Sequence, residues 1–463
     1  MSAVAWIAVG SLIAWVWLLL GQGFYWRTDQ RLPRRTEPAR WPSVAVVVPA
    51  RDEAEMLPVS LPSLLVQDYP GDARVILVDD CSSDGTGELA RELADRFGGL
   101  ALTVVTPGEP EPGWTGKLWA VRHGIALARL HKPDFLLLTD ADIAHEPDSL
   151  RDLVAAAGTE GPDGFDLVSQ MARLRVESFW ERLVVPAFVY FFGQLYPFRR
   201  VNRARSRTAA AAGGCVLLRT AAAERARIPE SIRQAVIDDV SLAREVRRGG
   251  GRIWLGLAER VDSVRPYPRL GDLWRMVARS AYAQLRHSPL LLAGTVPGLL
   301  LVYVAPPATL VAGLLTGDGA AAWAGGAAWA VMTVTYLPML SYYRQSLWLG
   351  PLLPFTAVLY LLMTVDSAVQ HYRGRGPPGR AVPMPGRRPP PTGDAARQRA
   401  SGPAGRRGGC GSLAAGGPVH APAVGGVDGA LRADAPVRHE VAGLALHGEV
   451  AAVVGDQCER ADR

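Results

Sequence analysis

Short apolar runs alternate with helix-patterned segments between residues 40 and 287, and this alternation constrains the fold more than any other feature of the chain. The apolar runs have the length of buried strands, and the segments between them carry apolar residues at helical spacing. Strands that alternate with helices predict a mostly parallel, doubly wound α/β sheet. The expected strands are Ser43–Pro49, Arg74–Asp79, Leu102–Val105 and Asp134–Thr139, and the expected helices cover 54–67, 86–97 and 117–130.

Three of these four strands end in carboxylates. Ala50–Glu53 follows the first strand, Asp79 and Asp80 end the second, and Asp140-Ala141-Asp142 follows the fourth. Ligands of open α/β sheets bind beyond the carboxyl ends of the strands, and acids gathered there repel one another unless a cation or a donor-rich ligand offsets them. No cluster of His and Cys accompanies the acids, so their oxygens predict Mg²⁺ or Mn²⁺, with both acids of the last pair facing one side of an extended strand end.

Three further segments have two interpretations each. Gly113–Trp119 is a glycine-flanked loop in which Lys117 opens a helix, which suits a phosphate group or is a plain capping turn. Gly213–Arg219 is a tight turn into a strand, which permits close approach of a ligand or is a simple hairpin. Asp238 and Asp239 begin an amphipathic helix, where acids are usually caps, but Asp239 is also a candidate general base at the crevice.

As a set, these segments resemble the ordered motifs of glycosyltransferase family 2. The motifs are Val48–Glu53, Val78–Thr86, Thr139–Asp142 and Asp238–Leu242. With Gly113–Ala120, Trp274–Leu285 and the apolar segments described below, residues 1–375 are similar to the hopene-associated glycosyltransferases within that family. The resemblance implies a nucleotide-sugar-binding fold of the A type, spanning about residues 41–287, and the inverting transfer of a sugar.

The resemblance also implies a donor site. Asp52 and Asp80 would contact the uracil or ribose part of a nucleotide sugar, with Asp79 in support. Asp142, helped by Asp140, would hold Mg²⁺ or Mn²⁺ on the diphosphate, and Asp140 would also belong to the donor site.

The remaining implied roles concern the chemistry of transfer. Asp239 would take the proton of the acceptor hydroxyl, and Lys117, in the donor site, would neutralise charge on the leaving group. Asp238, Arg275 and Arg279 are candidates for contacts with the diphosphate or the acceptor; a solvated or membrane-surface helix explains the two arginines equally well. The sequence near Arg275–His287 lacks the Q-x-x-R-W motif of processive family members. Its absence favours transfer of one sugar to a lipid.

Uncharged stretches at both ends of this region predict membrane segments. Residues 1–24 contain an uncharged run, 3–22, that is long enough to cross a hydrocarbon layer of about 30 Å. It lacks the basic start and small-residue cleavage site of a signal peptide, so we expect a retained anchor. The basic linker 25–40 predicts a cytoplasmic catalytic domain at a bacterial-type inner membrane. The charged fraction of 20% is below the usual value of about 25%, as expected when apolar spans dilute a soluble domain.

Residues 288–370 predict about three more spans, at 290–316, 320–340 and 348–368. Four spans would place the end of the chain outside, whereas the basic run 371–375 favours the inside, and a re-entrant segment is the alternative. The aromatic segment Phe179–Phe198 is either an interfacial segment or a core helix.

Residues 376–463 differ in composition from the rest of the chain. About a third of them are Gly or Pro, and Phe, Trp, Tyr, Ile, Asn and Lys are absent, so this tail predicts disorder. One hypothesis is that a frameshift replaced the natural C-terminus.

The sequence therefore predicts a multi-pass membrane enzyme whose partners are a nucleotide-sugar donor, a lipid acceptor and the membrane, with no nucleic acid. By resemblance alone, the acceptor would be a hopanoid. The alternatives are a processive polysaccharide synthase and, from another class, a catalytically inactive membrane scaffold.

Overall fold

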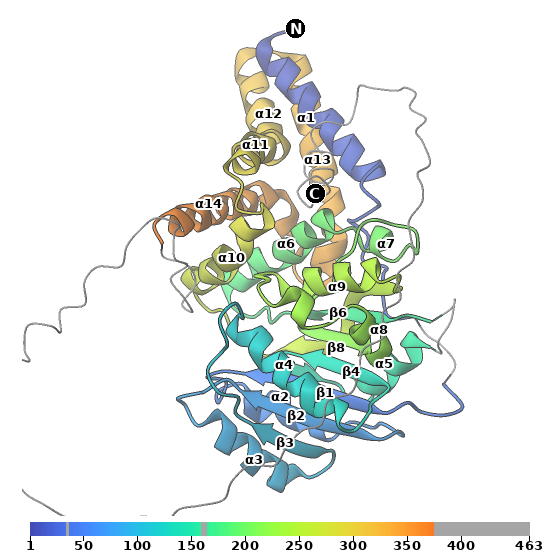
Figure 1. The fold of residues 1–463 in the computed structure, drawn as a ribbon. Helices are drawn as coiled ribbons and strands as arrows, with labels where there is room; N and C mark the ends of the chain where they lie inside the picture. The colour runs from blue at the N-terminus through green and yellow to red at the C-terminus, as the bar shows by residue number, and fades with distance from the viewer. Residues whose placement is uncertain (34–36, 159–163, 375–463) are drawn as a thin grey trace, which may run out of the picture. The chain divides into compact units, whose positions relative to one another are not determined.

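The computed structural model of the protein describes residues 1–33, 37–158 and 164–374. Within these residues, its centre is one eight-stranded sheet (Figure 1). The strands are β1 (Val44–Ala50), β2 (Ala73–Asp79), β3 (Ala101–Val105), β4 (Phe135–Thr139), β5 (Ile143–His145), β6 (Leu167–Arg173), β7 (Cys215–Arg219) and β8 (Ile253–Ser263). Their order in space is β3-β2-β1-β4-β7-β6-β8-β5.

The helices of the first two thirds of the chain connect or cover these strands. They are α1 (Ala3–Leu20), α2 (Leu57–Leu65), α3 (Thr86–Phe97), α4 (Gly116–Arg129), α5 (Ser149–Ala157), α6 (Phe179–Leu195), α7 (Phe198–Val201), α8 (Thr220–Arg225), the 3₁₀ turn η1 (Glu230–Ile232), α9 (Asp238–Arg248) and α10 (Leu270–Gln284). The last part is helical: α11 (Pro289–Leu299), the π-helical η2 (Leu300–Val304), α12 (Ala305–Thr316), α13 (Gly319–Tyr342), the 3₁₀ turn η3 (Leu347–Leu352) and α14 (Leu353–Tyr372).

The sheet confirms the expected mostly parallel α/β fold with apolar helices at both ends. Strand β1 pairs in parallel with both β2 and β4, β2 pairs in parallel with β3, and β6 pairs in parallel with β8. The antiparallel pairings involve β7, which lies between β4 and β6, and the short β5. Because Ala50 lies opposite Asp79 in the β1–β2 register, the carboxyl ends of the central strands reach one edge together.

Two apolar layers cover the sheet, as buried valines and leucines on both faces of β1, β2 and β4 require. One layer packs under α4, α6 and α9, and the other packs under α2, α3 and α5. Helix α4 lies unusually close to the sheet at Gly124, where a Cβ atom would come within 2.4 Å of Val47 Cγ1. This close approach places the beginning of α4 at the sheet edge where β1, β2 and β4 end.

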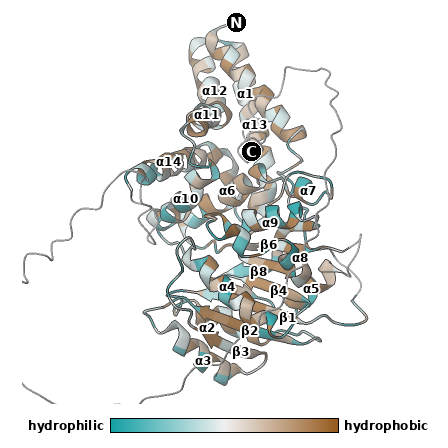
Figure 2. Ribbon diagram, in the orientation of Figure 1, coloured by the Kyte–Doolittle hydropathy of each residue, from teal (hydrophilic) through white to brown (hydrophobic). Residues whose placement is uncertain are grey.

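Apolar helices lie together on the side of the described structure that is opposite α3. There, α1, α12 and α13 lie side by side (Figure 1). Figure 2 shows hydrophobic residues along these helices as well as along the strands of the sheet. Within the described residues, three helical stretches are long and apolar enough to cross a membrane: Ala3–Leu20, Pro289–Thr316 and Leu347–Tyr372.

The span expected at 320–340 forms the helix α13, but this helix is less apolar than those three stretches. It is rich in alanine and glycine, and these small residues allow close helix packing. A Cβ atom at Gly325 would come within 2.4 Å of Thr309 Oγ1 on α12. The alanines and glycines of α13 therefore allow it to pack closely against α12.

Of the two interpretations of the aromatic segment, the structure adopts the core helix. Val184, Val185 and Tyr190 of α6 are buried. The Tyr190 hydroxyl lies 2.9 Å from the Tyr25 hydroxyl and 2.8 Å from Thr335 Oγ1, so α6 is joined to both apolar regions. The tail 376–463, for which we predict disorder and suspect a frameshift, lies outside the described residues.

Candidate active site

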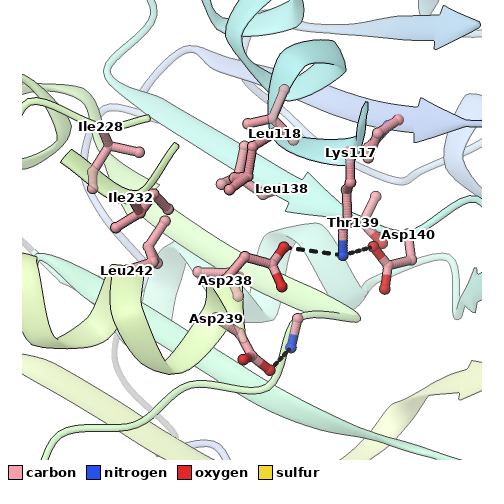
Figure 3. A pocket seen from close by; sticks show the side chains of 14 residues that line it. Lys117, Leu118, Leu138, Thr139, Asp140, Ile228, Ile232, Asp238, Asp239 and Leu242 are labelled. Carbon is pink, nitrogen blue, oxygen red and sulfur yellow. Dashed lines mark hydrogen bonds and ion pairs between the residues drawn. The ribbon is translucent and has the colours of Figure 1, made fainter. Parts of the chain in front are cut away.

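Lys117 joins two of the predicted acidic motifs at the carboxyl edge of the sheet (Figure 3). Its Nζ atom lies 2.8 Å from Asp140 Oδ1 and 3.3 Å from Asp238 Oδ2. Thr115 caps α4 by accepting a hydrogen bond from the Leu118 amide, and this fixes Lys117 in the first turn. Burial disfavours the ammonium charge, but the carboxylates outweigh this and raise the pKa of Lys117 above its usual range, so it stays charged.

Asp239 is held at the start of α9, beside this ion cluster. Its Oδ2 accepts a hydrogen bond of 3.0 Å from the Gly213 amide, and its Oδ1 accepts one of 2.7 Å from the Val240 amide. Burial and the neighbouring Asp238 raise the pKa of Asp239 to about 7, against the opposing effects of these amides and Lys117. Asp239 can therefore accept a proton near neutral pH. The turn at Gly213 thus places a backbone amide against the Asp239 carboxylate.

A small cavity lies between these groups. It encloses about 40 Å³, and Lys117, Asp140, Gly213, Asp238 and Asp239 contribute to its wall. This volume accommodates a group as small as a water molecule or a hydroxyl. The structure thus brings four predicted site residues together around this small cavity: Lys117, Asp140, Asp238 and Asp239.

Asp142 belongs to a different ion cluster from Asp140. Arg265, which follows β8, places its Nε atom 2.8 Å from Asp142 Oδ2 and its Nη2 atom 2.5 Å from Glu53 Oε1. The amide of Val264 donates to the backbone oxygen of Asp142, so the chain after β8 is anchored beside the acid. Asp140 and Asp142, for which we predict a common side of the strand end, are each paired with a different cationic side chain. The sequence analysis missed Arg265, because an isolated arginine far along the chain carries no signal of its partners.

The donor chemistry still fits Mg²⁺ or Mn²⁺. In the part of the chain that the structure describes, no group of three or more His, Cys, Asp or Glu residues forms a potential metal site. Mg²⁺ usually binds proteins through one or two carboxylates, and substrate phosphates and waters supply its other ligands. Asp140 and Asp142 provide such oxygens two residues apart, without a complete site of their own.

The predicted donor-binding acids after β1 and β2 hold the two loops together. Asp52, at a positive φ of 53°, accepts hydrogen bonds from the Ser83 amide and hydroxyl at 2.8 and 3.1 Å. The Asp79 carboxylate is buried and accepts from the Ser82 amide. Asp80 lies 3.4 Å from Arg51, and burial raises the pKa of Asp80.

Asp80 also lies against the beginning of α4, because a Cβ atom at Gly116 would come within 2.8 Å of Asp80 Oδ2. The acids after β2 and the Lys117 cluster are therefore neighbours along one edge.

The two predicted arginines of α10 have different surroundings. Arg275 is largely exposed and pairs with Asp272 at 2.5 Å, one turn back on the same helix. Burial and the Asp142 charge raise the pKa of Tyr267, and the nearby Arg265 and Arg279 oppose this effect. Of the two, only Arg279 borders the region of the acidic clusters.

A buried histidine, also missed by the sequence analysis, supports the loop after β4. His145 Nε2 lies 3.0 Å from Thr139 Oγ1, and its Nδ1 lies 3.0 Å from Ser149 Oγ. Burial lowers the pKa of His145 to about 4, so the ring is neutral at physiological pH. Because Thr139 precedes the Asp140–Asp142 loop and His145 follows it, the hydrogen bond between them joins the two ends of the loop.

The acids and Lys117 lie at the carboxyl edge of a mixed α/β sheet, which is where open α/β sheets bind their ligands. The chain belongs to the family described as "Glycosyltransferase like family 2", whose profile matches residues 42–283, more than half of the chain. This match confirms the family resemblance.

Two curated relatives show the range of the similarity. The undecaprenyl-phosphate 4-deoxy-4-formamido-L-arabinose transferase of Aeromonas hydrophila is 32% identical over 145 residues, which cover 30% of this chain and 40% of that protein. The 4,4'-diaponeurosporenoate glycosyltransferase of Staphylococcus haemolyticus is 36% identical over 101 residues, or 22% of this chain and 24% of that protein. The chain thus matches less than half of the length of these relatives.

Among solved structures, the mannosyltransferase PcManGT from Pyrobaculum calidifontis, in complex with GDP-Man and Mn²⁺, is 20% identical and has a TM-score of 0.45. The match covers 79% of this chain and 99% of that one.

Proposed function

We propose that this protein is an inverting glycosyltransferase that moves one sugar from a nucleotide sugar, namely a UDP-sugar, to a membrane lipid. The observation that carries the proposal is Asp239, a carboxylate whose pKa lies near 7. It faces the same small cavity as Lys117 and Asp140. Family membership supports the reaction class, and the cavity supports the assignment of its base.

In the proposed reaction, Asp239 accepts the proton of the acceptor hydroxyl while that oxygen attacks the anomeric carbon. The bond from this carbon to the donor diphosphate breaks, and the nucleoside diphosphate leaves with the electron pair. Lys117 lies where it can neutralise the developing charge, and such preorganised charge is usually the largest catalytic effect. A single displacement inverts the anomeric centre and needs one base, unlike the two carboxylates that retaining glycoside hydrolysis uses.

The donor would lie along the edge formed by β1, β2 and β4. Asp52 and Asp80 would contact its uracil or ribose, and the buried Asp79 would support their loop. Asp142 and Asp140 would hold Mg²⁺ or Mn²⁺, which supplies positive charge to the diphosphate when bound. Asp238 positions Lys117, and Arg279 is the better placed of the two α10 arginines for a contact with diphosphate or acceptor.

A lipid acceptor is supported by the apolar helices and by the relatives. Among the residues that the structure describes, three stretches of helix are long and apolar enough to cross a membrane. The names of both curated relatives refer to lipids, undecaprenyl phosphate and diaponeurosporenoate. We propose a multi-pass protein of the inner membrane with a cytoplasmic catalytic domain; a hopanoid acceptor rests on the sequence resemblance alone.

The test is an assay of the purified full-length protein with Mn²⁺, a panel of UDP-sugars and extracted membrane lipids. We expect release of UDP together with sugar in the organic phase. Sugar in a long water-soluble polymer would instead establish the processive synthase, and absence of UDP release with every donor would favour the inactive scaffold.

A further inference from the structure

A second and larger cavity lies where α13 meets the catalytic domain. It encloses about 800 Å³, within the range of ligand-binding sites. Four parts of the chain form its wall: the beginning of α2, the end of β6 with the residues after it, the end of β8 with the residues after it, and the end of α13.

This cavity shares a wall with the Arg265 cluster. Val264 and Pro266 both line the cavity, and the side chain of Arg265 between them reaches Asp142 and Glu53. The larger cavity is therefore adjacent to the Arg265 cluster.

The neighbouring residues favour a position of the cavity near the membrane surface. The Tyr342 hydroxyl donates to the Ala258 backbone oxygen at 2.6 Å, which anchors the end of α13 on β8. The candidate span Leu347–Tyr372 begins three residues after Arg344. Trp348, at its start, is 87% exposed, and exposed tryptophan is typical of the membrane–water interface.

The lining combines apolar and cationic side chains. Met56, Val59, Leu174 and Val176 supply apolar surface. Of the three arginines, Arg173 pairs with Asp262 at 2.7 Å, and Arg175 makes an exposed pair with Glu177, of a kind that contributes little to stability. Arg344 forms no ion pair with any carboxylate of residues 1–33, 37–158 or 164–374. Arg175 is thus easily released to another anion, and Arg344 has its charge available.

We propose that this cavity binds the head group of the lipid acceptor, and that the head group carries a phosphate beside its reacting hydroxyl. Arg344 and Arg175 would bind the phosphate, and the apolar lining would take the first part of the lipid chain. The inference rests on the proposed function, because it assigns the acceptor of the same reaction. A hydroxyl-only lipid such as a hopanoid would leave Arg344 without a counter-charge.

The experiment measures binding of two short-chain probes to the full-length protein in detergent: dihexanoyl phosphatidylglycerol and uncharged dihexanoylglycerol. We expect the wild type to prefer the phosphate probe. Arg344→Gln should raise its Kd about tenfold, as loss of a charge-assisted hydrogen bond does, and Arg344→Lys should restore part of the affinity. The matched control is Arg248→Gln, which removes an exposed arginine that is paired with Glu245 and lines neither cavity.

Equal affinity of the wild type for both probes would overturn the proposal. So would an unchanged Kd for the phosphate probe in the double variant Arg175→Gln/Arg344→Gln, with UDP binding intact as the measure of folding. If Arg344→Gln weakens binding as expected but no UDP-sugar supports transfer, the proposed function fails while the phosphate site stands. If transfer occurs but Arg344→Gln leaves the KM of the phosphate-bearing lipid unchanged, the cavity assignment fails while the function stands.

Discussion

Asp140 and Asp142 are two residues apart, yet they belong to two different ion clusters. Asp140 shares Lys117 with Asp238, beside the candidate base Asp239. Asp142 shares Arg265 with Glu53, at the loops that follow β1 and β8. Neighbouring acids of one motif can therefore serve different tasks, because the charges that face them come from distant parts of the chain.

The two cations differ in what they hold. Lys117 is a compact charge on a flexible stem and faces the small cavity, where a reacting group fits. Arg265 is a planar fork that bridges two carboxylates and faces the strand-end loops. We infer that the Lys117 cluster acts on the reaction itself, whereas the Arg265 cluster holds the donor side in place.

The largest expected effect is that of Asp239→Asn. The amide cannot accept the acceptor proton, so kcat should fall by a factor of about 10²–10⁴, while the KM of the donor stays unchanged. Steady-state kinetics of UDP release, with and without lipid acceptor, would measure this. The control is Asp148→Asn, which removes a partly exposed acid at the start of α5 that pairs with Arg260 and does not line the small cavity. A loss of less than threefold in kcat would contradict the assignment of the base.

The two cations should differ in their effect on kcat. Lys117→Met removes charge from the leaving group, and we expect a loss of about 10²–10³ in kcat. Arg265→Gln should cost about tenfold, because its charge acts through Asp142 and Glu53. If Arg265→Gln proved the more damaging of the two, the division of tasks between the clusters would be reversed.

Metal binding should show the opposite ranking. Arg265 neutralises Asp142, the main proposed metal ligand, so Arg265→Gln should strengthen Mn²⁺ binding in the absence of donor several-fold. Lys117→Met should strengthen it less, because Asp140 only assists. Electron paramagnetic resonance of free Mn²⁺ measures both affinities without any turnover, and Asp142→Ala, which removes the ligand, should weaken binding. Unchanged Mn²⁺ affinity in Arg265→Gln would show that Asp142 does not bind the ion.

The smallest effect concerns stability. Because burial raises the pKa of Asp239 to about 7 in the folded state, its ionisation above that pH opposes folding. The stability lost to this group grows as the pH rises from its unfolded pKa to about 7 and is complete above it. Asp239→Asn should therefore raise Tm by a few degrees at pH 8 and by less at pH 5. Thermal unfolding monitored by tryptophan fluorescence at both pH values would measure this, and an equal or lower Tm in the variant at pH 8 would contradict it.

Local patterns in the sequence predicted the first half of the catalytic domain well. Helix α3 covers residues 86–97, as its apolar spacing predicts, and β1, β2 and β4 follow their apolar runs. The sequence also predicted that the acids after these strands lie at one edge of the sheet, because parallel strands that follow one another in an α/β sheet end at the same edge. What the sequence could not predict is which cation meets which acid.

That pairing depends on the tertiary fold. Arg265 meets Asp142 because β8 pairs with β5, a contact between segments far apart in the chain. The neutral His145 is recognisable only from its burial between Thr139 and Ser149. The insertion of the antiparallel β7 between β4 and β6 likewise places Gly213 beside Asp239, which no local spacing indicates.

The pH dependence of kcat/KM in the wild type and in Asp238→Asn tests the central claim most directly, namely that Asp239 is the base. For the wild type we expect the rate to rise with pH and to level off above about 7, because the base must be ionised. Asp238 raises the pKa of Asp239, so Asp238→Asn should shift the inflection to lower pH. A profile that is flat through this range, or an inflection that stays in place or moves upward in Asp238→Asn, would contradict the assignment.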